Sequence, residues 1–186
     1  MTIDEARKLL TDVRPYFYRY AEPVKVYLHW TAGDYETTFG DYHFCIAGNG
    51  QIVNTRSLKE IPSATWKRNT GSIAIAICCC QGAVAYSGEP NYADLGHFPP
   101  TVEQTEALAR LMAVIADVFE IPINIFHFLT HGEAADNLDG EYYHEPYGQD
   151  TTCERWDLAV LDESTTWGQG GNILRGMANW YLKHGG

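Results

Sequence analysis

The segment Lys25-Val-Tyr-Leu-His-Trp-Thr-Ala-Gly33 contains the features that decide the fold. Its apolar residues Val26 and Leu28 alternate with polar or amphipathic neighbours, which predicts a short β-strand. Thr31-Ala32-Gly33 then predicts a turn. His29 therefore stands at the C-terminal end of a strand, where the strand fixes the side chain and the mouth of the fold lies beside it. A histidine there is either a hydrogen-bonded structural residue or part of a functional site.

Three helices are predicted around this strand. Thr2-x-x-Glu5 and Thr101-x-x-Gln104 are capping-box patterns, and apolar residues at helical spacing follow each of them. The second pattern predicts a helix over residues 101–119, and residues 173–182 form a third, closing helix.

Four further stretches predict strands. Residues 42–47 and 51–55 flank Gly48-Asn49-Gly50, a strong signal for a β-hairpin. The apolar, β-branched run over residues 73–79 suits a central strand that is covered on both faces. Residues 123–129 predict one more strand, which ends close to His131.

Two long segments between these elements are expected to be loops. Residues 82–100 are rich in Gly, Pro, Asn and Asp, and residues 134–152 form a polar segment of a length usually kept for function. No internal repeat or linker interrupts the chain. The simplest interpretation is one α+β domain over residues 1–186, with a central mixed β-sheet flanked by helices.

Composition excludes several classes of partner. The formal net charge is −11 with only 13 Lys and Arg, so no broad basic face for nucleic acid can be built. No apolar run is long enough to enter and cross a bilayer, and the N-terminus lacks the pattern of a signal peptide. We therefore expect synthesis in the cytoplasm without membrane insertion. The sequence carries no indication of an oligomeric state.

The chain has five cysteines, an odd number. Three of them, Cys78, Cys79 and Cys80, are adjacent in an apparent strand and cannot pair readily with one another. Cys45 also lies in a strand pattern. These residues are expected to be small buried side chains of a protein that folds in a reducing compartment.

Two histidines and one aspartate line up as a candidate metal site. His29 ends one strand, His131 ends another, and Asp157 follows the long polar segment. Two imidazoles and one carboxylate would leave the fourth position of a tetrahedral zinc ion open for water, as in hydrolytic sites. The spacing of these residues alone is not diagnostic.

The chain resembles the zinc-dependent N-acetylmuramoyl-L-alanine amidases, which share their fold with the peptidoglycan recognition proteins. It looks most like the phage and prophage branch. Six segments match the family's pattern in order: His29-Trp-Thr-Ala32, Tyr42-His-Phe44 with Gly50, Asn69 to Ile75, the helix over residues 101–119, Thr130-His-Gly-Glu133, and Arg155-Trp-Asp157.

The resemblance implies that His29, His131 and Asp157 bind Zn²⁺. It places Tyr42 near the metal-bound water and makes Arg155 the basic residue two positions before the third ligand. Cys153 is a rival for the third position, because some members use cysteine there. Residues 65–68 depart from the family's pattern, which often has a histidine here, and Ala74 stands where glycine is common.

Several other residues keep two interpretations. Glu133 either orients a ligand histidine or takes a proton, unless it is only a solvated loop residue. Tyr42 and Arg155 could be a strand aromatic and a surface ion-pair partner. Four aromatic residues are candidate walls of a saccharide or peptide groove, or else pack the loop: Trp66, Tyr142, Tyr143 and Tyr147.

The function implied by the resemblance is zinc-dependent hydrolysis of the amide between N-acetylmuramic acid and L-alanine in peptidoglycan. Tyr42 and Arg155 would stabilise the oxyanion or assist proton transfer. The absence of a signal peptide and of a separate wall-binding domain favours a phage or prophage endolysin that is released to the cell wall after synthesis. The alternatives are a cytoplasmic amidase that recycles soluble muropeptides and a peptidoglycan-binding domain without activity. Asp157 argues against the last of these, because such domains usually lack the third ligand.

Overall fold

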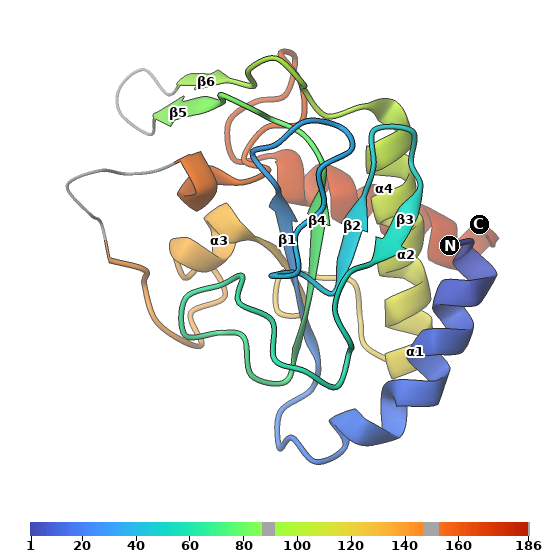
Figure 1. Cartoon of the computed structure of the whole chain (residues 1–186). Coiled ribbons are helices and arrows are strands. Elements are labelled where there is room, and N and C mark those ends of the chain that lie inside the picture. Colours follow the sequence, from blue (N-terminus) through green and yellow to red (C-terminus); the bar gives the residue numbers. More distant parts are fainter. Residues whose placement is uncertain (87–91, 147–152, 186) are drawn as a thin grey trace.

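The computed structural model describes residues 1–86, 92–146 and 153–185, and its centre is a mixed sheet (Figure 1). The sheet has five strands in the order β3-β2-β4-β1-β7. Their bounds are Lys25–Trp30 for β1, Phe44–Ile46 for β2, Ile52–Asn54 for β3, Ser72–Ile77 for β4 and Phe128–Thr130 for β7. β1 runs parallel to β4 and β7, β2 runs parallel to β4, and β2 and β3 form an antiparallel hairpin. The predicted mixed sheet and the Gly48-Asn49-Gly50 hairpin are confirmed.

The two central strands are buried along their whole length. Every residue of β1 and β4 is buried, as expected of strands that have a neighbour on each side and elements on both faces. Figure 1 shows α1 (Ile3–Phe17), α2 (Val102–Phe119) and α4 (Gly170–His184) on one side of the sheet. The short helix α3 (His131–Ala135) and the 3₁₀ turn η1 (Cys153–Trp156) lie on the other side.

The predicted helix starts are confirmed in atomic detail. Thr2 and Glu5 form a capping box at α1, and Thr101 and Gln104 form one at α2. The buried Gln104 amide also donates hydrogen bonds of 3.0 Å to the carbonyl of Ile46 and 2.7 Å to that of Cys78. The start of α2 is thereby bonded to the ends of β2 and β4, which fixes the helix against the sheet.

Two sequence expectations were wrong. The segment 82–100 is not all loop, because β5 (Val84–Tyr86) and β6 (Tyr92–Asp94) pair as a small antiparallel sheet. The strand expected over residues 123–129 shortens to β7. The cause lies at Asn124, whose side chain accepts a hydrogen bond from the Phe126 backbone and whose carbonyl accepts from His127 and Phe128, so the chain turns before it extends.

The described cysteines agree with the expected reduced, buried state: Cys45, Cys78, Cys79 and Cys80 carry free thiols and are buried. Within the described ranges, no helix combines the length and apolar character that a bilayer span requires.

Candidate metal centre

The register of two parallel strands brings the two candidate histidines together. β1 pairs with β7 so that Leu28 lies opposite Thr130, and His29 and His131 follow these residues at the same edge of the sheet. Their ring centroids are 4.9 Å apart. Asp157 lies at the same place, and it directly follows η1 in the sequence. Sequence positions 128 residues apart therefore meet at one buried point.

The three side chains form a compact set of donor atoms. Asp157 Oδ2 lies 3.2 Å from His29 Nδ1 and 3.4 Å from His131 Nδ1. All three ligand atoms lie within 4.8 Å of one another. Zinc bonds of about 2.0–2.1 Å in a tetrahedron put neighbouring ligand atoms roughly 3.3 Å apart. The two distances to Asp157 match that spacing, so these residues fit a metal ion.

Two buried atoms at this point support the same interpretation. His131 Nδ1 and Asp157 Oδ1 are both buried, and neither has a hydrogen-bond partner among the described residues. Buried polar atoms are almost always paired in native proteins. A metal ion bonded to His131 Nδ1 would give that nitrogen a partner.

The electrostatics of the centre differ between the two histidines. Burial lowers the pKa of His29. Burial also acts to lower the pKa of His131, but the neighbouring carboxylates of Asp157 and Glu145 outweigh it and raise that pKa to about 9. The contact with His131 in turn lowers the pKa of Glu145. The two carboxylates thus stabilise a cation at His131, and a proton or a metal ion can supply it.

The sequence missed two residues that contact the histidines from outside. Thr65 Oγ1 lies 3.2 Å from His29 Nε2, and Glu145 Oε2 lies 3.1 Å from His131 Nε2. The Glu145 carboxylate is an acceptor and the Thr65 hydroxyl can act as one, and an Nε2–H on each ring would leave Nδ1 available to a metal. Thr65 stood out in the sequence only as a departure from the family's histidine. No local pattern singled out Glu145.

Glu133 is buried beside the start of α3 and pairs with α4. Its carboxylate accepts two hydrogen bonds of 2.7 Å from the Arg175 guanidinium and one of 2.9 Å from the Thr130 backbone. A Cβ at Gly171 would collide with the Glu133 carboxylate, so α4 approaches this closely because residue 171 is glycine. Glu133 therefore caps α3 and pairs with α4. These contacts go to Arg175 and Thr130, and through the cap they act on His131 indirectly.

A sequence signal for this arrangement was present. Thr130-x-x-Glu133 is a capping box like those of α1 and α2, and it starts the helix on which His131 is the first residue. The cap fixes the point where the chain leaves β7. It consequently fixes the direction in which His131 points.

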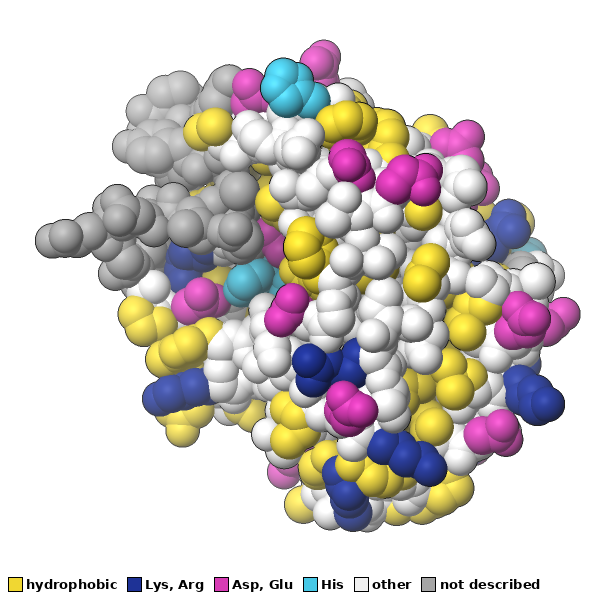
Figure 2. All heavy atoms as spheres, in the orientation of Figure 1, with side chains coloured by type: hydrophobic (Ala, Val, Ile, Leu, Met, Phe, Trp, Pro, Cys, Tyr) yellow, Lys and Arg dark blue, Asp and Glu magenta, His cyan; other side chains and the backbone are white. Residues whose placement is uncertain are grey.

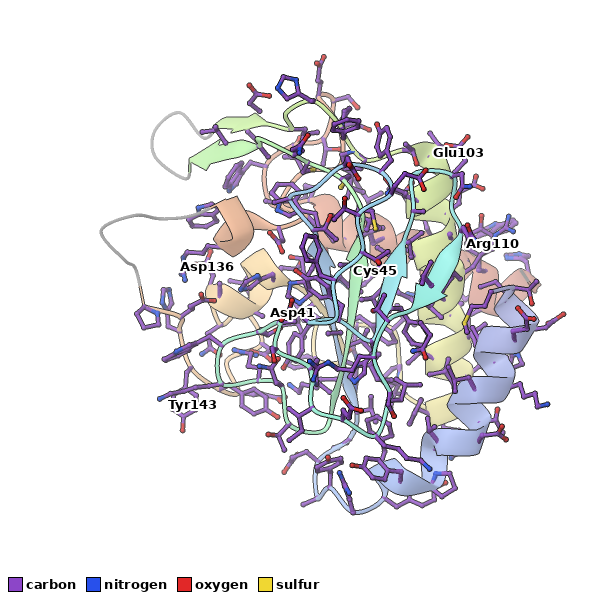
Figure 3. The ribbon with its side chains drawn as sticks, in the orientation of Figure 1. Asp41, Cys45, Glu103, Arg110, Asp136 and Tyr143 are labelled. Carbon is purple, nitrogen blue, oxygen red and sulfur yellow. The ribbon has the colours of Figure 1, made fainter. Side chains whose placement is uncertain are left out.

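Arg155 is buried beside α3. Its guanidinium donates hydrogen bonds of 2.9 Å to the Glu145 carbonyl, 3.3 Å to the Ala135 carbonyl and 3.0 Å to Asp136 Oδ1. Asp136 lies at the end of α3 (Figure 3). These bonds hold the segment that carries Glu145 against α3. They give Arg155 a positioning role.

Tyr42 lies beside the centre. It is half-buried, and its ring centroid is 5.2 Å from that of His29. The ring also packs against Cys45, Ala76 and Cys78. Tyr42 precedes β2 rather than belonging to it. The bend at this point brings the ring toward the metal-binding edge.

Among the remaining candidates, Trp66, Tyr142 and Tyr143 are exposed at the surface. Tyr147 and the side chain of Cys153 lie outside the described residues.

Comparison with known proteins identifies the family. Residues 19–155 match the model of the Amidase_2 family, N-acetylmuramoyl-L-alanine amidase. The match ends two residues before Asp157, so the placement of that carboxylate comes from the structure. The Ph2119 endolysin from Thermus scotoductus MAT2119 bacteriophage Ph2119 is a solved structure similar to this chain, with 17% identity, 65% of this chain and 84% of that chain covered, and a TM-score of 0.43. No curated protein sequence matches the chain significantly. Because the family match spans well over half of the sequence, the chain belongs to the N-acetylmuramoyl-L-alanine amidase family.

Proposed function

We propose that this chain is a zinc amidase that cleaves the bond between the lactyl group of N-acetylmuramic acid and the L-alanine of the stem peptide. His29, His131 and Asp157 are the proposed ligands. The observation that carries the proposal is the buried set of two imidazoles and one carboxylate, in which Asp157 Oδ2 lies 3.2 Å from His29 Nδ1 and 3.4 Å from His131 Nδ1, the spacing of neighbouring ligands of one tetrahedral ion.

The chemistry that zinc supplies in such sites is Lewis-acid activation of a water molecule and of the scissile carbonyl. The chain's own residues have to present the ligands correctly. In this role Thr65 and Glu145 would accept the Nε2–H of His29 and His131, which would select the tautomer with Nδ1 unprotonated and fix each ring. Arg155 holds the Glu145 segment in place. Tyr42, beside His29, is the proposed group that donates a hydrogen bond or a proton at the reacting carbonyl.

Purified protein is expected to contain about one zinc ion per chain, as the three-ligand site predicts. Elemental analysis of protein prepared without chelator tests this. Dialysis against a chelator should remove both the metal and the activity, and added zinc should restore both. A metal-free chain with full activity would end the zinc proposal.

Replacement of Tyr42 by phenylalanine is expected to lower turnover about tenfold to a thousandfold, the range for one transition-state donor or proton-transfer group. The ring still packs against its neighbours, so zinc content and thermal stability should stay unchanged. Steady-state kinetics on a peptidoglycan substrate give the answer. Unchanged turnover would make Tyr42 a packing residue only.

We propose intact peptidoglycan as the substrate, in the manner of an endolysin. Exposed aromatic side chains near the site, Trp66 and Tyr143 among them, suit an extended polymer that lies across the surface. Two outcomes separate the alternatives. Rapid turnover of soluble anhydro-muropeptides with inert sacculi would indicate a recycling enzyme. Zinc-loaded protein that binds sacculi and releases nothing would indicate a recognition domain.

A further inference from the structure

Lys67 stands in an unusual backbone conformation beside the metal centre. Its φ is +56°, in the left-handed region that non-glycine residues rarely adopt. Trp66 and Lys67 are exposed, whereas Thr65 and Arg68 on either side of them are buried. The side chains of Trp66 and Lys67 therefore project into solvent from this turn, while the residues on either side of them are buried. Strain of this kind is found most often at functional sites.

The Lys67 ammonium lies between two aromatic rings. Its Nζ is 4.6 Å from the Trp66 ring centroid and 4.7 Å from that of Tyr143. The two rings meet edge to face with centroids 6.1 Å apart. Figure 3 labels Tyr143 at the outer edge of the molecule, and Figure 2 shows a basic side chain among hydrophobic ones at the same edge. We refer to Trp66, Lys67 and Tyr143 as the aromatic cage.

Lys67 differs from the basic residues around it in having no carboxylate partner within the described ranges. Lys25 and Arg68 are both paired with the buried Asp139, at 3.0 Å and 2.9 Å. The Lys67 ammonium instead contacts the faces of rings, which leaves N–H donors to point outward. In a chain of net charge −11, an exposed cation without a carboxylate partner in the described part of the chain can attract an anion.

The cage has two halves, Trp66 with Lys67 in one segment and Tyr143 in another, and each segment also contacts the metal centre. Thr65, two residues before Lys67, contacts His29, and Glu145, two residues after Tyr143, contacts His131. Arg68 joins the halves, because it donates a hydrogen bond of 3.4 Å to the Tyr143 carbonyl. Two residues span at most about 7 Å of chain. A peptide bound with its first amide at the metal centre would therefore reach the cage within a few residues.

We propose that the aromatic cage binds a carboxylate of the stem peptide and makes the enzyme selective for acidic over amidated stem peptides. Lys67 donates charge-assisted hydrogen bonds to the carboxylate, and the Trp66 and Tyr143 rings pack against the apolar atoms next to it. The inference rests on the proposed function, because it takes the peptide of the amidase substrate as the ligand.

The test uses two N-acetylmuramyl tripeptides that differ only in whether the α-carboxyl of the second residue is free or amidated. Wild-type protein is expected to show a kcat/KM about tenfold higher for the acid, the effect of about one exposed charge-assisted hydrogen bond. Lys67→Gln should lower kcat/KM for the acid by about the same factor, mainly through KM, and leave the amide unaffected. Lys67→Arg should keep most of the preference.

Lys183→Gln is the matched control. It removes the same charge from the exposed end of α4, on the far side of the sheet, and should leave the ratio of acid to amide unchanged. Equal hydrolysis of the two peptides by wild-type protein would overturn the proposal. Equal losses on both peptides in Lys67→Gln would do the same, since they would indicate damage to the loop rather than lost recognition.

Calorimetric binding of the two free tripeptides to the same proteins tests the carboxylate site without any need for hydrolysis. Tighter binding of the acidic peptide, lost in Lys67→Gln, is the expected result. The same result in a protein that cleaves neither muramyl peptide would remove the proposed function and keep the carboxylate site. Affinities that do not change with Lys67, or no binding of either peptide to wild-type protein, would overturn the site itself.

Discussion

Replacement of His131 by alanine or of Asp157 by asparagine is expected to lower amidase activity by at least about a thousandfold, because each removes a ligand of the proposed zinc site. Both side chains meet at one buried point, and their buried atoms Nδ1 and Oδ1 have no hydrogen-bond partner in the described part of the chain. The loss should appear together with a loss of bound zinc in elemental analysis. His29→Ala is expected to behave in the same way.

The protein should remain folded in these variants, because the ligands lie at the ends of β1 and β7 and after η1. Circular dichroism and thermal unfolding at fixed zinc concentration check this. Cys153→Ala is the control for the third ligand and should keep both metal and activity. Zinc lost from Cys153→Ala but retained by Asp157→Asn would show that the third ligand was assigned to the wrong residue.

Replacement of Glu133 by alanine is expected to lower the free energy of unfolding by about 3–5 kcal/mol, the usual effect of breaking a buried ion pair from one side. Glu133 and Arg175 are both buried and joined by two hydrogen bonds of 2.7 Å. Without the carboxylate, the Arg175 guanidinium would stay buried without its counter-charge. Urea denaturation at fixed zinc concentration measures the effect.

Two further variants serve as controls for the effect of Glu133→Ala on the free energy of unfolding. Glu106→Ala breaks an exposed pair with Arg110 on α2 and should change the free energy of unfolding by no more than about 0.5 kcal/mol. The double variant Glu133→Leu with Arg175→Met should recover a large part of the lost stability, because it removes both buried charges. A Glu133→Gln protein with wild-type stability and a thousandfold lower turnover would instead restore a catalytic role for Glu133.

The local patterns in the sequence predicted the elements that local physics determines. Strand β1 follows from the alternation around Val26 and Leu28, and the starts of α1 and α2 follow from their capping boxes. The same pattern at Thr130 and Glu133 starts α3, at a place where the sequence predicts a strand end followed by a loop. The small β5–β6 sheet could not be predicted from its Gly- and Pro-rich segment, since short strands depend on tertiary pairing.

The residues of the candidate site also fall into those that the sequence predicted and those that depend on tertiary structure. The family resemblance singled out His29, His131 and Asp157, and the structure brings them together. Glu145 could not be predicted from the sequence, because its contact with His131 depends on how an aperiodic segment folds back over α3. The position of Arg155 relative to Asp157 was correct in the sequence, yet charge and spacing do not determine which acceptors a guanidinium meets. Its bonds go to the Glu145 segment instead.

Mass spectrometry of purified sacculi after incubation with the protein tests the central claim most directly. We predict free stem peptides with an N-terminal L-alanine and intact glycan strands. Release should stop in the presence of a chelator and return when zinc is added. New reducing sugar ends would mean that glycan bonds are cut, and peptide release that is insensitive to the chelator would mean that no metal takes part. Either result would contradict the assignment of a zinc amidase.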